Sequence, residues 1–201
     1  FYHDFGLRGI WMSIFHSVSA FCNAGFDLLG TKWHPFVSLT SYAVNPVINI
    51  VIMLLIIIGG IGFFTWEDIY LHKFHFKHYH MQSKVILTTT LCLILLPAVF
   101  FFFQDYGNLG IHRLLASLFQ AVTPRTAGFN TTDLSMLTGA SKAMMILLML
   151  IGGSPSSTAG GMKTTTFALL LLNVLATFQS RDECVCNIRK RTGNRGFWKK
   201  I

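Results

Sequence analysis

Charged residues are scarce in this sequence. Asp, Glu, Lys and Arg make up only 12% of its 201 residues, and just eight residues are acidic. No pair of carboxylates lies in an apolar setting and no nucleophile stands beside a candidate base, so the sequence does not support an enzyme. Hydrophobic residues reach 52%, and the mean hydropathy is +0.54. This composition is typical of an integral membrane protein.

Cysteine is also rare, with four in the chain. Cys22 and Cys92 stand in apolar surroundings, while Cys184 and Cys186 form a C-x-C in a basic segment. Neither a disulfide framework nor a zinc site is expected from this pattern. Four histidines gather near residue 75, but no carboxylate or cysteine is interleaved with them: His72, His75, His78 and His80. A basic, lipid-facing loop without an apolar face is favoured over a metal site, and no cofactor is expected.

The basic residues are concentrated in two places. The net charge is +8, and ten of the sixteen Lys and Arg residues lie in 73–84 and 181–200. Basic residues beside apolar spans mark cytoplasmic segments of membrane proteins. Residues 66–84 and 181–201 are therefore predicted to be cytoplasmic. Membrane lipids rather than nucleic acid are the expected partners.

Two apolar runs, 46–64 and 85–103, are long enough to cross a bilayer. A third apolar stretch is broken, because a Gly-, Ser- and Thr-rich segment, 152–166, separates 143–151 from 167–178. Such interruptions point to the functional region of transporters. The fold class is thus predicted to be all-α and membrane-integral, with a broken inner helix.

Two shorter amphipathic segments, 7–20 and 111–122, each precede an Ala-Gly-Phe sequence. This order predicts pore helices followed by re-entrant loops, whose backbone carbonyls line a water-filled path and replace the hydration shell of potassium. The predicted ion filter comprises Asn23, Ala24, Gly25 and Phe26 in the first loop and Thr126, Ala127, Gly128 and Phe129 in the second. Potassium as the transported ion is the only metal expected, and only at this filter.

The residues around the filter have expected roles of their own. Glycine is required where backbone must approach an ion at φ values closed to other residues. Phe26 and Phe129 are expected to pack behind the loops as rigid supports. Arg125 is expected to point away from the path and to pair with a carboxylate or with loop carbonyls.

The two halves of the chain form a parallel repeat. Gly25 and Gly128 are separated by 103 residues, and the pair Gly59-Gly60 is separated from Gly152-Gly153 by 93. The shared order is pore helix, loop, apolar run and glycine pair. An ordinary glycine turn outside the membrane is the alternative for each loop, and the repetition counts against it.

The Gly-rich interruption is not a nucleotide-binding P-loop, because Met162 rather than glycine precedes Lys163. It is predicted to be an intramembrane gating loop, and Lys163 would be a cation within a span that raises the barrier for potassium. A flexible cytoplasmic linker is the alternative. The predicted gating loop comprises Gly152, Gly153, Ser154, Pro155, Ser156, Ser157, Thr158, Ala159, Gly160, Gly161 and Lys163.

The segments FHSVSAFCNAGFDLLG, IIIGGIGF, TPRTAGFNTTDL and IGGSPSSTAGGMKTTT resemble the Trk/Ktr/HKT superfamily of potassium transporters. The resemblance implies repeated, potassium-channel-like M1–P–M2 units, four around one pore, with one filter loop each. Residues 1–84 would hold the second unit from its pore helix onward. Residues 85–201 would hold the third unit with its gating loop and tail. Gly25 and Gly128 would be the filter glycines.

The resemblance also implies partners and a larger whole. Family members form dimers and bind a cytosolic, nucleotide-binding regulatory subunit, which basic segments such as 66–84 and 181–200 would contact. Two filter loops are missing, so we expect this chain to be an excerpt of a longer one. A non-conducting, truncated paralogue that acts as a membrane scaffold or regulatory subunit is the alternative. Secondary transport of another solute is disfavoured by the lack of buried carboxylates for proton coupling.

Overall fold

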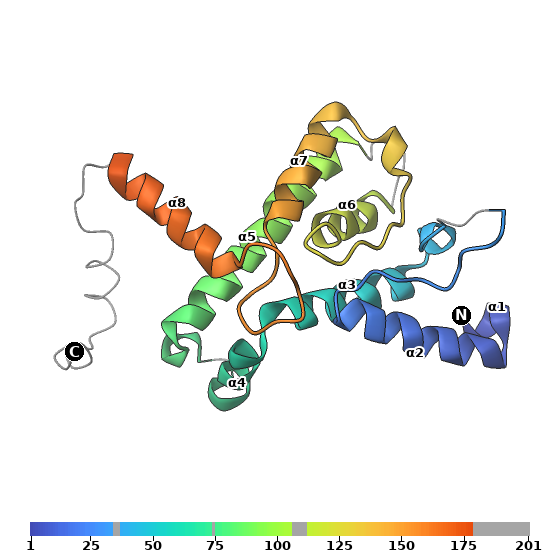
Figure 1. Ribbon diagram of the computed structural model, residues 1–201, viewed down its shortest axis with the longest axis horizontal. Helices are drawn as coiled ribbons and strands as arrows, with labels where there is room; N and C mark the ends of the chain where they lie inside the picture. The colour runs from blue at the N-terminus through green and yellow to red at the C-terminus, as the bar shows by residue number, and fades with distance from the viewer. Residues whose placement is uncertain (34–36, 74, 106–111, 179–201) are drawn as a thin grey trace.

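The computed structural model describes residues 1–33, 37–73, 75–105 and 112–178, so the predicted tail 181–201 lies outside the described residues. Within this part the chain is helical, as predicted, and its β structure is one isolated bridge between Ile151 and Met162. Figure 1 shows the arrangement of the helices. They are α1 (Tyr2–Phe5), α2 (Leu7–Phe21), α3 (Pro46–Ile61), α4 (Phe63–His72), α5 (Met81–Gln104), α6 (Arg113–Val122), α7 (Gly139–Leu150) and α8 (Thr164–Phe178), with short 3-10 turns at η1 (Thr40–Tyr42), η2 (Phe76–His78) and η4 (Leu134–Met136).

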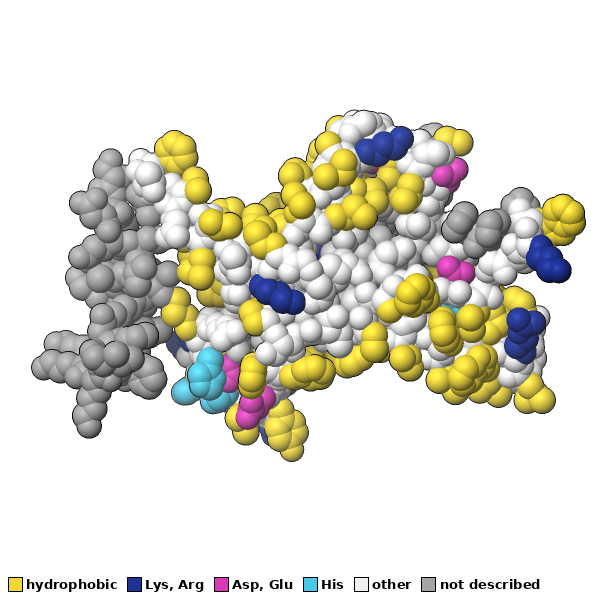
Figure 2. All heavy atoms as spheres, viewed as in Figure 1, with side chains coloured by type: hydrophobic (Ala, Val, Ile, Leu, Met, Phe, Trp, Pro, Cys, Tyr) yellow, Lys and Arg dark blue, Asp and Glu magenta, His cyan; other side chains and the backbone are white. Residues whose placement is uncertain are grey.

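By length and composition, α5 is the one described helix that could cross a membrane by itself. Its 24 residues span roughly 36 Å, which exceeds the thickness of a bilayer's hydrocarbon core. The helix continues through Pro97. Many of its large apolar side chains are exposed, such as Leu96 at 72% and Phe103 at 75%, and Figure 2 shows hydrophobic side chains over much of the visible surface. An exposed apolar helix of this kind is suited to contact with lipid.

The first predicted span, 46–64, is shorter than expected. The helix begins where the sequence predicts, because the Asn45 side chain accepts hydrogen bonds from N–H groups of the first turn and Pro46 occupies that turn. It ends earlier than predicted, because α3 stops at Ile61 and the chain bends by 97° into α4. The bend lies at Gly62, whose φ of 94° is closed to most other residues. The straight helix within the predicted span 46–64 is therefore limited to Pro46–Ile61.

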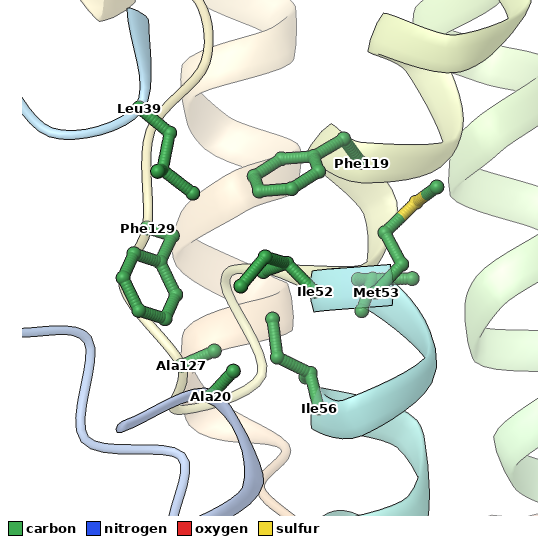
Figure 3. Close-up of a cluster of buried hydrophobic side chains, with 9 residues drawn as sticks. Ala20, Leu39, Ile52, Met53, Ile56, Phe119, Ala127 and Phe129 are labelled. Atoms are coloured by element: carbon green, nitrogen blue, oxygen red, sulfur yellow. The ribbon is translucent and has the colours of Figure 1, made fainter. Parts of the chain in front are cut away.

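The main core surrounds α3 and joins both predicted pore helices to it. Figure 3 shows Ile52 and Ile56 of α3 with Ala20 of α2, Phe119 of α6 and the loop residue Phe129. Phe119, Phe129 and Ala20 are fully buried. A second cluster joins α5, α6 and α7. The two predicted pore helices, which lie far apart in the sequence, are therefore both held against α3.

A buried carboxylate ties α4 to the start of α5. Asp68 is 2% exposed and accepts hydrogen bonds from the His80 backbone N–H (2.9 Å), from His80 Nδ1 (2.6 Å) and from Ser83 Oγ. A buried carboxylate is stable only with such donors. Among the described residues, no group of three or more His, Cys, Asp and Glu side chains is arranged to hold a metal ion.

The expectation that the basic segment lacks an apolar face is wrong. A groove of about 900 Å³ lies in this segment and at the start of α5, and most of its lining is apolar. Its lining residues are Ile69, Tyr70, Leu71, Lys73, Phe76, Tyr79 and Leu87. The pattern is hidden in the sequence because the groove combines residues from α4, η2 and α5.

The close packing of α2 on α3 generates a stability test. A Cβ on Gly59 would lie 1.9 Å from the Phe21 carbonyl oxygen, whereas a Cβ on the neighbouring Gly60 would meet no atom within 4 Å. Gly59→Ala should therefore destabilise the protein by about 1–3 kcal/mol through overpacking. Gly60→Ala should be neutral or stabilising by up to about 1 kcal/mol, because alanine favours helix. Thermal unfolding of the two purified variants measures the difference, and equal melting temperatures would contradict this packing.

Candidate functional site: two glycine loops and the α7–α8 loop

The two Ala-Gly-Phe loops lie against each other. A Cβ on Gly25 would lie 2.0 Å from the Ala127 carbonyl oxygen and 3.3 Å from the Gly128 Cα. Both glycines have positive φ, 71° for Gly25 and 86° for Gly128. Gly128 has open space where a Cβ would stand. Gly25 is thus required for both conformation and space, and Gly128 for conformation alone.

The same backbone pattern occurs in both loops. Two residues before each glycine, Asn23 has a φ of 52° and Thr126 a φ of 76°. Left-handed conformations are uncommon for non-glycine residues, and for a β-branched threonine especially so. Equivalent positions of the two loops therefore share an unusual conformation that the Ala-Gly-Phe sequence alone does not reveal.

Each loop is tied back to its own helix by a hydroxyl group. Ser19 Oγ donates to the Phe26 carbonyl (2.9 Å), and Thr123 Oγ1 donates to the Phe129 carbonyl (2.5 Å). Ser19 and Thr123 were not singled out from the sequence. The sequence feature that could have identified them is a hydroxyl-bearing residue near the end of each amphipathic segment. Both loops are therefore fixed at their far ends as well as at their helices.

The chain between α2 and α3 supports the second loop. Leu39 donates its backbone N–H to the Asn130 carbonyl (2.9 Å), and the Asn130 N–H donates to Ser38 Oγ (2.9 Å). Leu39 is also part of the core around α3. Sequence analysis treated this stretch as a simple connection, because contacts across about ninety residues leave no local pattern.

The two phenylalanines differ, and the expectation for one of them is wrong. Phe129 is fully buried in the core around α3, whereas Phe26 is 69% exposed. Phe129 meets α3 and α6, while no described element covers Phe26. Only Phe129 packs behind its loop as a rigid support.

The expected pairing of Arg125 is also not observed. Its side chain is 4% exposed, yet Nε and Nη1 have no hydrogen-bond partner among the described residues. The buried oxygens Asn23 Oδ1 and Thr126 Oγ1 likewise have none there. Buried polar atoms in proteins nearly always have a partner. The unsatisfied atoms concentrate in the two loops, which marks this region as polar within an apolar surrounding.

The loop between α7 and α8 closes on itself. Gly152 donates its N–H to the Met162 carbonyl (2.9 Å), and Met162 donates to Leu150 (3.2 Å). A Cβ on Gly152 would lie only 1.7 Å from the Gly160 carbonyl oxygen. The two arms therefore approach more closely than any side chain permits. This compact form replaces the flexible linker that was the alternative from sequence.

The same loop caps the broken α3–α4 helix pair. Ser154 donates its N–H to the Gly60 carbonyl (2.9 Å), and Thr158 donates to Gly59 (3.2 Å). The Phe63 N–H at the start of α4 donates to the Ser156 carbonyl (3.0 Å). Helix ends leave such groups without partners inside the helix. The α7–α8 loop thus supplies the hydrogen bonds that the bend at Gly62 removes.

The loop also contacts both Ala-Gly-Phe loops. Thr158 Oγ1 donates to the Phe21 carbonyl (2.8 Å) and accepts from Asn23 Nδ2 (3.1 Å). On the other side, a Cβ on Gly161 would lie 3.6 Å from Thr126 Cγ2. The structure therefore brings the predicted filter loops and the predicted gating loop together in one place.

Lys163 is held within its own loop. Its Nζ donates to the Ala159 carbonyl at 2.8 Å, and its side chain is half-buried. Hydrogen bonding to a carbonyl oxygen partly compensates the cost of placing an ammonium group in a poorly hydrated region. The lysine charge therefore has a defined position beside the loop backbone.

Comparison with known proteins agrees with this architecture. A family model described as TrkH, cation transport protein, matches residues 2–103 and 72–195. The chain is 40% identical over 184 residues to the Ktr system potassium uptake protein B of Bacillus subtilis, covering 88% of this chain and 40% of that protein. It is 40% identical over 147 residues to the potassium/sodium uptake protein NtpJ of Enterococcus hirae, covering 70% of this chain and 31% of that protein.

A solved structure shows the same fold. The potassium transporter TrkH from Vibrio parahaemolyticus matches with a TM-score of 0.68 and 23% sequence identity, over 84% of this chain and 36% of that one. The chain thus spans less than half the length of each of these proteins. Because the family model matches nearly the whole chain, the chain belongs to the TrkH family of cation transport proteins.

Proposed function

We propose that this chain forms part of a pathway for potassium uptake across the cell membrane, with the Gly25 and Gly128 loops supplying filter carbonyls. The observation that carries the proposal is the contact between two loops 103 residues apart in sequence that share left-handed backbone at equivalent positions. Left-handed backbone turns carbonyl groups in directions that ordinary loops do not allow. The relatives named as potassium uptake proteins support potassium as the ion.

A complete filter of four loops would need two more than this chain contains. We therefore propose that the other loops come from parts of the protein outside these residues, since the chain spans 40% of its Bacillus relative. Residues 1–84 would then be most of one M1–P–M2 unit and 85–201 the next. The order of α2, loop and α3 in the first and of α6, loop and α7 in the second supports this division.

The α7–α8 loop is proposed to be the gate. It contacts both filter loops, and the Thr158 side chain joins it to the Phe21 carbonyl and to Asn23. A loop in this position obstructs an ion path until it rearranges. Lys163 would add an electrostatic barrier to potassium while the loop is closed.

The basic segments 66–84 and 181–201 are proposed to face the cytoplasm, following the bias of Lys and Arg toward that side. A cytosolic nucleotide-binding subunit and a second copy of the protein are the proposed partners. The link between α4 and the gating loop, from Phe63 to Ser156, offers a route from that face to the gate.

The filter is tested by Gly128→Ala in the full-length protein. A Cβ at this position meets no atom within 4 Å, so the change acts only through the φ of 86°, at a strain of about 1–3 kcal/mol. If the loop relieves this strain by rotating its carbonyls, potassium uptake should fall about tenfold or more, since about 1.4 kcal/mol corresponds to a factor of ten. Growth of a potassium-uptake-deficient bacterium at low potassium measures the loss.

Gly139→Ala is the matched control, because this glycine also has open space around its Cβ position and lies in the first turn of α7. It should leave uptake unchanged. Full uptake by a well-expressed Gly128→Ala protein would contradict the filter role of this loop. Absence of uptake by the well-expressed wild-type protein would favour the non-conducting scaffold.

The gate is tested by Thr158→Val. The substitution keeps the shape of the side chain and removes the hydroxyl that donates to Phe21 and accepts from Asn23. Each hydrogen bond contributes about 1 kcal/mol. Loss of both should shift the equilibrium between the closed and the open loop toward the open form by a factor of about thirty. Potassium flux into vesicles should rise under conditions in which the wild-type protein is closed. Thr158→Ser retains the hydroxyl and should behave as wild type, and equal fluxes in all three proteins would exclude the latch.

A further inference from the structure

We propose that the groove between α4, η2 and α5 binds one anionic phospholipid, with an acyl chain along its apolar lining and the headgroup phosphate at Lys73. The groove has a volume of about 900 Å³, within the range of cavities that hold organic ligands. Its lining residues include Tyr70, Leu71, Phe76 and Leu87, and Lys73 is the one charged residue among those described there. This proposal concerns a binding site and does not depend on conduction.

The bend between α3 and α4 is compatible with a groove at the surface of the membrane. The two helices are bent by 97° from each other, so α4 would run along the bilayer surface where α3 enters the bilayer. Tyr70 is 82% exposed and Leu71 is 62% exposed. An interfacial helix with an exposed aromatic and aliphatic side binds at the boundary between headgroups and acyl chains.

The position of Leu87 along α5 suits contact with an acyl chain. Lys73 caps the end of α4, before α5 begins at Met81. Leu87 is six residues into α5, or roughly 9 Å along its axis. Interfacial apolar groups insert to about 5–10 Å. With the start of α5 at headgroup level, the Leu87 end of the groove would lie at acyl-chain level.

The charges around the groove favour an anion. The Tyr79 hydroxyl donates to the Lys73 carbonyl, which holds η2 close to the end of α4. Lys84 Nζ donates to the Lys77 carbonyl (2.7 Å), which brings the Lys84 cation from α5 to η2. The acidic residues Glu67 and Asp68 instead line an adjoining cavity of about 560 Å³, which shares Leu71 with the groove. Juxtamembrane cations of this kind attract anionic lipid, with about 1 kcal/mol per residue near the surface.

A lipid in this groove would act on the gate, and this consequence rests on the proposed function. The Phe63 N–H at the start of α4 is bound by the Ser156 carbonyl of the gating loop. A ligand that fixes α4 against α5 therefore also restrains that loop. Potassium flux would then differ between vesicles with and without anionic lipid, whereas lipid binding itself is measured separately.

The binding test uses the full-length protein purified from vesicles containing equal amounts of phosphatidylglycerol and phosphatidylcholine, analysed by native mass spectrometry. Wild-type protein should retain phosphatidylglycerol in preference to phosphatidylcholine. Lys73→Gln should abolish the preference, because the headgroup loses its cation. Leu87→Trp should reduce retention of both lipids, because it fills the apolar end of the groove. Lys142→Gln removes an exposed lysine at the start of α7 and should retain the wild-type preference.

Other outcomes of this experiment would contradict the proposed lipid site. Retention of phosphatidylglycerol by Lys73→Gln at the wild-type level, or its equal loss in Lys142→Gln, would show that Lys73 does not hold a specific headgroup. Displacement of the lipid by inorganic phosphate would indicate a simple anion site. Size-exclusion chromatography checks that the variants are folded, and Lys73→Gln changes only an exposed side chain. If Leu87→Trp fails to fold, the Lys73 result alone still decides.

Discussion

Backbone groups that leave a helix inside a membrane must find hydrogen-bond partners within the protein, and this requirement organises the whole chain. The helical path is interrupted after α2, between α3 and α4, after α6 and between α7 and α8. The loop between α7 and α8 bonds to the α3 end at Gly59 and Gly60 and to the α2 end at Phe21. Three of these interruptions, after α2, between α3 and α4 and between α7 and α8, therefore supply hydrogen-bond partners to one another.

This mutual satisfaction would restrict the movement of the proposed gating loop between α7 and α8. If the loop withdrew completely, it would leave the Gly59 and Gly60 carbonyls and the Phe63 N–H without partners. Each unsatisfied buried group costs about 1–3 kcal/mol, and the three together approach the total stability of a small domain. If this loop is the gate, its opening would therefore cost less as a local shift near Thr158, which keeps the arms paired through Gly152 and Met162 and lets water replace the lost contacts.

The sequence predicts local features well. The approximate positions of the helices, the broken inner helix and the need for glycine at positions 25 and 128 follow from periodicity, capping residues and glycine chemistry, and the structure agrees with them. The predicted span 46–64 fails at its end, because Phe63 and Phe64 continue the apolar composition past the bend. Nothing in composition distinguishes a straight apolar helix from one that turns at Gly62.

Contacts between distant segments account for the remaining differences. The exposure of Phe26, the unpaired donors of Arg125 and the groove at Lys73 depend on which elements meet in space. A local sequence pattern does not encode such tertiary contacts. Hydroxyl anchors such as Ser19 and Thr123 are an intermediate case, because their position at a helix end is visible but their acceptor is not.

The two loops share a backbone conformation but not an environment, and this difference bears on how a filter built from them works. Gly25 is confined by the Ala127 carbonyl, while Gly128 has space around it. Asn23 is hydrogen-bonded to Thr158 in the loop between α7 and α8, whereas Thr126 lies beside Gly161 of that loop, with room for a Cβ at ordinary contact distance. If the α7–α8 loop is the gate, its rearrangement would break a hydrogen bond of the first loop. In a filter built from these two loops, the first would then be the one that is coupled to the gate.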